Sequence, residues 1–375
     1  MRYRYTLLSA LTILVIASAC SPAVVDPEAQ SPTEGAIASE TGGGFSITDA
    51  LGRELDFEQP PQRVAIAGRA SSLLANALYL FPEASQRIVG IEDRSTQSAS
   101  PILPVIDPDP GDKIFFEKNA GPEQIAPAHP DVVILKSYMA ESLGEPLEKL
   151  GITIVYLDLE TPEQFFRDIE ILGKLFGNSE RAREVQSYYQ ERLDRVQMVT
   201  ADIPATQKPS VLIIQYSDQG GDVAFKIPPA SWLQTTMVEL VGGAPVWTEA
   251  SETGGWAIVN FEQIAAWNPD QIYVVYYPGD AKPITEHLKS DPKWQAIKAV
   301  QQNQLFAFPG DFLSWDQPDT RWILGLSWLF TKVQPELADD IDIMQEVNQF
   351  YEQLYRLDQE IIQDEVNPVL NGDLP

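Results

Sequence analysis

The chain has 375 residues and a net charge of −28, with 54 acidic and 26 basic side chains, two histidines and one cysteine. So acidic a molecule repels phosphates, which argues against nucleic acid and anionic lipid headgroups as partners. An anionic ligand would need a locally basic site. A single cysteine also excludes a disulfide within the chain.

The first twenty residues are typical of an export signal. Two arginines precede an apolar run over residues 6–19, and this run of about fourteen residues is shorter than the roughly twenty that cross a bilayer as a helix. We therefore expect residues 1–20 to be a cleaved signal peptide. The sequence in front of Cys20 resembles a bacterial lipobox, which predicts lipidation of Cys20. The alternative is ordinary secretion with a spare thiol.

Residues 21–44 are rich in Ser, Pro, Ala, Glu and Gly and show no apolar period. This composition predicts a flexible tether. A lipid and a tether would keep the globular part near a membrane partner, which suits a receptor better than a diffusing enzyme. About 330 residues follow, too many for one comfortable core and suited to two lobes.

Short β-branched runs alternate with longer helical patterns in these residues, which predicts an α/β fold with mainly parallel strands. The runs are Val64–Ala67, Ile88–Ile91, Val132–Leu135, Ile152–Leu157, Val211–Gln215, Ile272–Val275 and Leu305–Phe308. A helical pattern with a break near Gly177 separates the first four from the last three. We expect an N-terminal lobe at 45–160, a connecting helix at 161–200, a C-terminal lobe at 201–366 and a tail at 367–375.

An internal echo relates the two lobes. The sequence EQIAPAHPD at 123–131 precedes the third run, and EQIAAWNPD at 262–270 precedes the sixth. One copy would be an ordinary helix-to-strand connection, in which Pro stops the helix and Asp opens the turn. Two copies, one per lobe, indicate related lobes that face each other across a cleft.

The echoed segments resemble those of the periplasmic substrate-binding proteins for iron–siderophores, haem and cobalamin. The resemblance covers most of the globular part, including ITDALGR at 47–53, LVGG at 240–243 and DPKW at 291–294. It implies a class III periplasmic binding protein, with two Rossmann-like lobes joined by a long rigid helix. Such a protein docks on the permease dimer of an ABC importer, which works with ATPase subunits, and delivers a metal chelate from the cleft between its lobes.

The resemblance also implies a role for the first residue of each echo. In this family, glutamates at the positions of Glu123 and Glu262 form ion pairs with arginines of the permease. The simpler interpretation is local, because a carboxylate at a helix start is stabilised by the helix dipole. Duplication at matched positions favours docking at the outer face of the cytoplasmic membrane.

Catalytic and free-metal functions find little support in the sequence. Nucleophile-elbow, zincin, Walker A and dinucleotide-binding motifs are absent, so we expect no enzyme and no cofactor. A free-ion site needs several converging His and carboxylate ligands, whereas His129 precedes a strand and His287 sits in a polar helical segment. We therefore predict no metal site built from side chains.

Candidate ligand residues follow the predicted strands, because ligands of open α/β sheets bind beyond the carboxyl ends of strands. Aromatic rings with a few Arg or Lys groups suit a large, flat, partly anionic chelate. The candidates are Arg69, Ser71, Arg94, Lys136 and Tyr138 in the first lobe and Tyr216, Phe225, Trp256, Tyr276, Trp315 and Arg321 in the second.

Some aromatic residues are assigned elsewhere or stay ambiguous. Trp232 and Trp322 fall in helical patterns and are expected in the core. Tyr276 and Tyr277 are adjacent in a strand, so at most one of them faces the ligand. The basic candidates favour an iron–siderophore. Cobalamin, which needs less positive charge, and haem are alternatives, and an extracellular enzyme on the same fold is the rival from another class.

Overall fold

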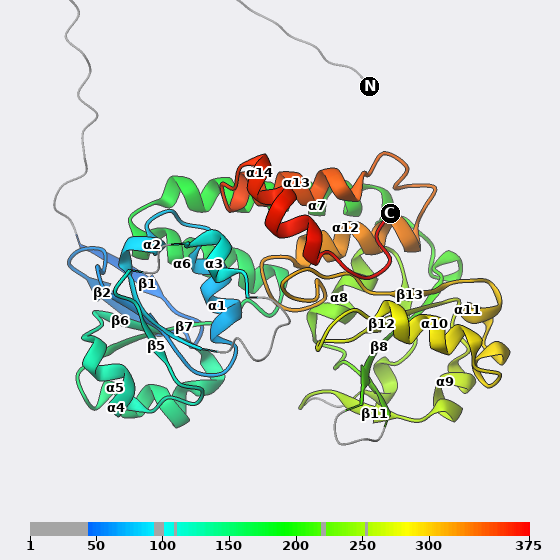
Figure 1. Ribbon diagram of the computed structural model, residues 1–375, viewed down its shortest axis with the longest axis horizontal. Coiled ribbons are helices and arrows are strands. Elements are labelled where there is room, and N and C mark those ends of the chain that lie inside the picture. The colour runs from blue at the N-terminus through cyan, green and yellow to red at the C-terminus, as the bar shows by residue number, and fades with distance from the viewer. Residues whose placement is uncertain (1–43, 94–100, 109–110, 219–222, 252–253) are drawn as a thin grey trace, which may run out of the picture. The chain divides into compact units, whose positions relative to one another are not determined.

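The computed structural model describes residues 44–93, 101–108, 111–218, 223–251 and 254–375. Two separate sheets with flanking helices, one parallel and one mixed, form its framework, as expected for an α/β protein of two lobes (Figure 1). Cys20, the signal segment and Arg94 lie outside the described residues.

The first lobe contains a five-stranded sheet in the order β5-β4-β3-β6-β7, and every pair of neighbours is parallel. Its strands are β3 (Val64–Ile66), β4 (Ile88–Glu92), β5 (Ile114–Phe116), β6 (Val132–Lys136) and β7 (Thr153–Leu157). The helices are α1 (Ser71–Leu78), α2 (Ala84–Arg87), α3 (Leu103–Ile106), α4 (Pro122–Ile125) and α5 (Glu145–Glu148). An antiparallel hairpin of β1 (Phe45–Thr48) and β2 (Glu54–Phe57) precedes them.

The second lobe contains a sheet in the order β11-β9-β8-β12-β13, with the short β10 also paired to β8. Its strands are β8 (Ser210–Ser217), β9 (Ala224–Ile227), β10 (Ala244–Pro245), β11 (Ala257–Val259), β12 (Gln271–Val275) and β13 (Leu305–Ala307). The β8, β10, β12 and β13 pairings are parallel, and those of β9 are antiparallel. The helices are α8 (Leu233–Leu240), α9 (Phe261–Trp267), α10 (Lys282–Ser290), α11 (Lys298–Gln301), α12 (Trp322–Val333), α13 (Ile343–Leu354) and α14 (Gln359–Ile361).

Two helices, rather than one, occupy the segment between the lobes. The first, α6 (Pro162–Phe176), begins at Thr161, whose side chain accepts from the backbone of the third helical residue, and ends at Gly177 with φ 67°. Asn178 then starts α7 (Ser179–Thr200) by accepting from the Arg181 amide. Helix α6 packs against β1 of the first lobe, whereas α7 packs against α6 and against α8 and α12 of the second lobe. Of these two helices, α7 is therefore the one that reaches the second lobe.

The C-terminal segment contacts both lobes (Figure 1). Its Arg356 guanidinium donates to the Tyr79 and Leu80 carbonyls of the first lobe. Residues 367–375, expected as a tail, are bound to the second lobe, since the Trp328 indole donates to the Asp373 carbonyl at 3.0 Å. The lobes are therefore tied together at a second place besides α7.

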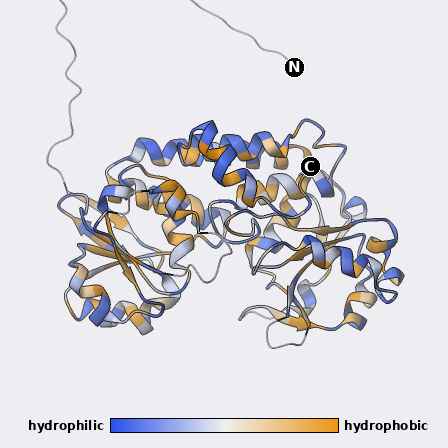
Figure 2. Cartoon of the chain, viewed as in Figure 1, coloured by the Kyte–Doolittle hydropathy of each residue, from blue (hydrophilic) through white to orange (hydrophobic). Residues whose placement is uncertain are grey.

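The strands and the helix faces against them carry most of the hydrophobic residues (Figure 2). Strands β3, β6 and β12 are buried along their whole length, as expected for parallel strands covered on both faces. Among the described helices, none is both long and apolar enough to cross a membrane.

The two echoed segments take matching structures. His129 and Asn268, six residues after the paired glutamates, both adopt a left-handed conformation, with φ 46° and 41°. The aspartate two residues later accepts from backbone N–H at the start of the neighbouring strand, Asp131 from Gln62 and Arg63 and Asp270 from Ser210. The echo thus reflects a repeated helix-to-strand unit that aligns β6 with β3 and β12 with β8.

Candidate functional site

A cleft of about 440 Å³ is lined by residues of both lobes. The first lobe contributes the segments that follow β3, β6 and β7, and the second contributes the start of α8, the loop before β11, the end of β12 and the loop before α12. The lining residues are Arg69, Tyr138, Glu160, Trp232, Leu233, Gln234, Gly254, Trp256, Tyr277, Gln317 and Pro318. We call this space the interlobe cleft.

Arg69 and Tyr138 form the exposed part of the first-lobe wall. Arg69 follows β3, and its guanidinium makes no ion pair with the described residues. Tyr138 follows β6, is 56% exposed, and donates its hydroxyl to the Arg69 carbonyl at 3.3 Å. Of the cleft-lining residues in the described part of the chain, Arg69 is the cation, so an anionic ligand atom would meet its charge there.

Lys136 does not reach the cleft, contrary to expectation. This last residue of β6 is fully buried, and its ammonium group pairs with Glu160 at 2.8 Å and donates to the Asp158 carbonyl. The desolvated charge requires such partners. Lys136 therefore holds the Glu160 carboxylate at the cleft wall and offsets its charge.

Aromatic rings form the second-lobe wall. Trp232 and Trp256 meet edge to face with centroids 5.8 Å apart, and Trp256 meets Tyr277 in the same way at 6.1 Å. Edge-to-face contacts of this kind fix ring orientation and add to the free energy of burial. The wall presents large, flat, rigid apolar surfaces to whatever occupies the cleft.

A buried carboxylate supports this wall from behind. Asp316 accepts from the Tyr277 hydroxyl at 2.9 Å, from the Gln234 amide at 3.0 Å and from the Ser314 hydroxyl at 2.6 Å. Burial raises the pKa of Asp316, while these hydrogen bonds oppose the rise. The network fixes two cleft-lining side chains, Gln234 and Tyr277.

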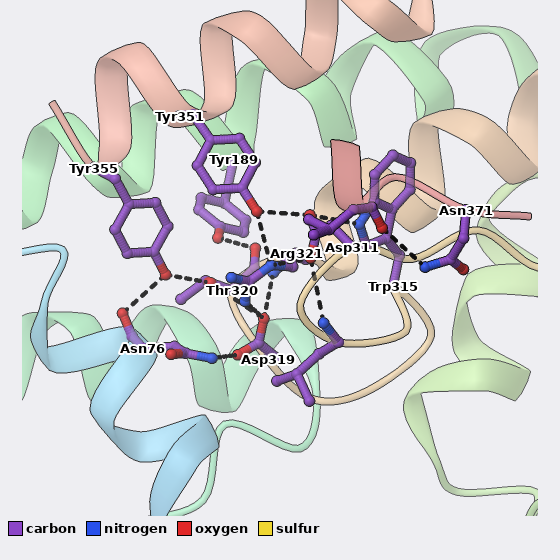
Figure 3. Close-up of polar contacts among 12 residues, drawn as sticks. Asn76, Tyr189, Asp311, Trp315, Asp319, Thr320, Arg321, Tyr351, Tyr355 and Asn371 are labelled. Atoms are coloured by element: carbon purple, nitrogen blue, oxygen red, sulfur yellow. Dashed lines mark hydrogen bonds and ion pairs between the residues drawn. The ribbon is translucent and has the colours of Figure 1, made fainter. Parts of the chain in front are cut away.

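Three other sequence candidates are buried away from the cleft. Ser71 donates its hydroxyl to the Glu92 carbonyl, and Trp315 is 0% exposed with its indole bound to Asp311. Arg321 is also 0% exposed and pairs with Asp311 at 2.7 Å and Asp319 at 2.6 Å. Figure 3 shows these charges within a polar cluster, so their role is structural.

The remaining second-lobe candidates form a separate aromatic cluster. Tyr216 contacts Phe225 at 5.9 Å and Tyr276 at 5.8 Å between ring centroids. None of these three is among the described residues that line the interlobe cleft. Of the adjacent tyrosines, Tyr277 rather than Tyr276 lines it.

Of the two tryptophans that the sequence assigns to the core, one is misplaced. Trp232, expected in the core, precedes α8 and lines the cleft, whereas Trp322 is buried as expected. The other lining residues that were not predicted from the sequence are Glu160, Leu233, Gln234, Gly254, Gln317 and Pro318. Position in the chain could have indicated three of them, because Glu160 closely follows the end of β7 and Gln317 and Pro318 closely follow the candidate Trp315.

The paired glutamates lie at the starts of α4 and α9. Both Glu123 and Glu262 are exposed and occupy the first turn of their helices. The structure gives no ion pair to either within the described residues. Their carboxylates are therefore accessible to a partner.

The described residues contain no group of three or more His, Cys, Asp or Glu side chains that could hold a metal ion. The described lining residues offer aromatic area, one guanidinium without an ion pair and a few hydrogen-bonding groups. That combination suits binding of an intact organic or chelate ligand better than coordination of a bare ion.

Comparison with known proteins identifies the class. The family model described as "Periplasmic binding protein" matches residues 95–312, more than half of the chain. The chain belongs to this family, whose members are the extracytoplasmic solute-binding components of ABC importers.

Relatives span almost the whole chain. The molybdate-binding protein MolA of Haemophilus influenzae is 22% identical over 337 residues, 83% of this chain and 90% of its own. A periplasmic solute binding protein from Veillonella parvula has a TM-score of 0.69 at 25% identity, covering 87% of this chain and 97% of its own. CeuE of Helicobacter pylori, solved as a nickel–histidine complex, has a TM-score of 0.66 at 19% identity, covering 86% and 99%. These relatives are binding proteins rather than enzymes.

Proposed function

We propose that the protein captures a metal chelate of the iron–siderophore type in the interlobe cleft and delivers it to the permease of an ABC importer. The observation that carries this proposal is the opposition of the Trp232–Trp256–Tyr277 wall to the Arg69 guanidinium across one cleft. Aromatic faces supply contact area to a bulky chelate, and a guanidinium forks onto its oxygen atoms.

The charges in the cleft narrow the chelate class. Two of the four basic candidates, Lys136 and Arg321, are buried and paired with carboxylates, and Arg94 lies outside the described residues. Arg69 is then the cation among the described lining residues. Within a molecule of net charge −28, one unpaired cation among the described lining residues favours a neutral or weakly anionic complex over a multiply charged one. Cobalamin, with low charge and a broad macrocycle, is the main alternative within the class.

Protein purified from its own host tests the proposal. Native mass spectrometry should show an added mass for a metal-bearing organic ligand, with an absorbance band in the visible range for an iron or cobalt complex. A stoichiometric ligand without metal would contradict the chelate assignment.

An oxyanion is the second candidate function. It is favoured by the likeness to MolA, which by its name binds molybdate, and by the free Arg69 guanidinium. The aromatic wall argues against it, since a compact tetrahedral dianion needs several converging donors rather than ring faces. Calorimetric titration with molybdate distinguishes the two candidate functions. Binding in the micromolar range would favour an oxyanion ligand, and the absence of a heat change would exclude molybdate as the ligand.

Glu123 and Glu262 are proposed to pair with arginines of the permease, one from each lobe. Support comes from their exposure and from the matching geometry of the two echoed segments. Charge pairs at a transient interface chiefly set encounter rate and orientation, so these residues should affect delivery and leave ligand affinity unchanged.

Lipidation of Cys20 is the remaining proposal, and it rests on the sequence in front of that residue. Replacing Cys20 by Ser should move the protein from the membrane fraction to the soluble extracytoplasmic fraction in its host. An unchanged membrane fraction would show that something other than this thiol anchors the protein.

A further inference from the structure

A second hollow of about 490 Å³ lies in the first lobe beside the interlobe cleft. We call it the first-lobe compartment. The lining residues are Gly68, Arg69, Glu92, Asn119, Ala120, Gly121, Pro122, Tyr138, Met139, Ser142 and Leu143. Arg69 and Tyr138 also line the interlobe cleft, so these two side chains border both spaces.

The topology of the sheet places the compartment where a ligand can bind. From β3 the chain first adds β4 and β5 on one side and then returns to add β6 and β7 on the other. In open α/β sheets the ligand crevice lies outside the carboxyl ends of the strands at such a reversal. The segment 68–69 follows β3 and the segment 138–139 follows β6, which are the two strands at this point.

The lining of the compartment is mostly uncharged and apolar. Ala120, Pro122, Met139 and Leu143 supply carbon surface, and Ser142 supplies one exposed hydroxyl. Among the described residues that line the compartment, Arg69 is the only basic one. The space therefore suits carbon and neutral polar groups and offers little to a second anionic group.

Glu92 joins two loops that line the compartment. It is 1% exposed, and its two carboxylate oxygens accept from the backbone N–H of Gly68 at 2.6 Å and of Asn119 at 2.8 Å. Both of those residues have left-handed backbones, with φ 81° and 64°. The carboxylate thus fixes the loops on two sides of the space, so the hollow is part of the folded structure.

We propose that the first-lobe compartment receives an uncharged, largely apolar arm of the chelate, while the metal-bearing part stays between Arg69 and the aromatic wall of the interlobe cleft. This inference rests on the proposed function and adds a substrate class to it, namely chelates that carry a substituent beyond the coordinating core. A compact oxyanion would leave the compartment empty.

Two ferric trihydroxamates that share one coordinating core test the inference. They are uncharged complexes and differ only in an acyl arm, acetyl in one and octanoyl in the other. Burial of the longer arm should make the octanoyl complex bind wild-type protein at least about tenfold more tightly, as measured by quenching of tryptophan fluorescence.

Ser142→Trp then fills the compartment with an indole from an exposed position on its wall. The preference for the octanoyl complex should fall below about threefold, and the acetyl complex should bind as it does to wild type. Glu141→Trp is the matched control, because Glu141 is the exposed neighbour that does not line the compartment, and it should keep the preference.

Each failure has a distinct meaning. Equal affinity of wild type for both complexes, or a preference that persists in Ser142→Trp, would show that the compartment does not bind the acyl arm. Either result would leave the proposed function unaffected. If neither complex binds wild type, the inference and the iron-chelate proposal both fall. The wild-type comparison decides even if the tryptophan variant does not fold.

Discussion

At the scale of single residues, the difference between Arg69 and the other basic candidates lies in their partners. Arg69 is exposed at the cleft, whereas Lys136 and Arg321 are buried against carboxylates. A buried charge contributes to stability through its partners and is not available to a ligand. Removal of Arg69 is therefore expected to weaken ligand binding, whereas removal of Arg321 is expected to lower the stability of the fold.

Replacing Arg69 by Ala should weaken binding of an oxygen-bearing chelate by about 1 to 3 kcal/mol, the usual contribution of a charge-assisted hydrogen bond. Fluorescence titration measures the loss. Arg183→Ala is the control, because Arg183 is an exposed arginine on α7 outside the cleft lining. Unchanged affinity of the Arg69 variant would remove that residue from the site.

Replacing Arg321 by Met should instead lower the free energy of unfolding by about 3 to 5 kcal/mol, because two buried carboxylates lose their cation (Figure 3). Urea unfolding gives the value. Arg195→Met should cost less than about 1 kcal/mol, because Arg195 is partly exposed and its partner Glu346 keeps Arg192. Equal losses for the two variants would show that the buried ion pairs of Arg321 contribute no more to the free energy of unfolding than an exposed pair does.

At the scale of elements, the strands were the most predictable part of the structure. Seven β-branched runs correspond to β3, β4, β6, β7, β8, β12 and β13, because parallel strands covered on both faces are continuously apolar. The edge strand β11 has only three residues and an exposed Ile258, so it lacks that signal.

The candidate site was predictable in its segments and less so in its side chains. Arg69 and Tyr138 were found because they follow strand ends. The choice between Tyr276 and Tyr277 depends on the distant Asp316, and the burial of Lys136 depends on Glu160. Such pairings are set by tertiary packing between segments far apart in sequence, which no local pattern reports.

The echoed aspartates allow a test of one repeated element. Partial burial alone would raise the pKa of Asp270, but hydrogen bonds from Lys298 and Ser210 outweigh it and hold that pKa below its usual value. Because the pKa of Asp270 is lower in the folded state than in the unfolded state, its carboxylate stabilises the fold at pH values above the unfolded-state pKa of 3.8. This stabilisation is lost as the pH falls through the folded-state pKa.

Asp270→Asn should therefore reduce the free energy of unfolding at pH 7 by about 1 kcal/mol, and the difference from wild type should shrink as the pH falls below 3.8. Urea unfolding at several pH values measures it. Asp202→Asn, in an exposed loop, is the control and should have little effect. A difference that stays constant down to pH 3 would contradict the assigned pKa.

At the scale of the whole molecule, polar contacts join the two lobes at several points (Figure 3). The Asn76 amide of the first lobe donates to Asp319 of the second at 2.5 Å, and the Tyr355 hydroxyl donates to the Asn76 carbonyl at 3.0 Å. Helix α7 and the C-terminal segment also connect the lobes. These ties restrict the distance between Glu123 and Glu262, which the proposed docking on a permease dimer would require.

Reversing both docking charges, Glu123→Arg with Glu262→Arg, should abolish uptake in vesicles reconstituted with the permease and ATPase, because like charges then meet at the interface. Ligand affinity and thermal stability should not change. Glu163→Arg with Glu180→Arg, two first-turn glutamates of α6 and α7, controls for helix-start effects. Wild-type uptake by the Glu123→Arg, Glu262→Arg variant would show that the two glutamates do not dock the permease and act only at the starts of their helices.

The central claim is that a metal chelate occupies the interlobe cleft. Anomalous diffraction at the iron edge, from crystals of the protein loaded with a ferric chelate, locates the metal directly. We predict one peak between Arg69 and Trp256, within reach of both lobes. A peak elsewhere on the molecule, or none in crystals of protein that binds the chelate one to one in solution, would contradict the account.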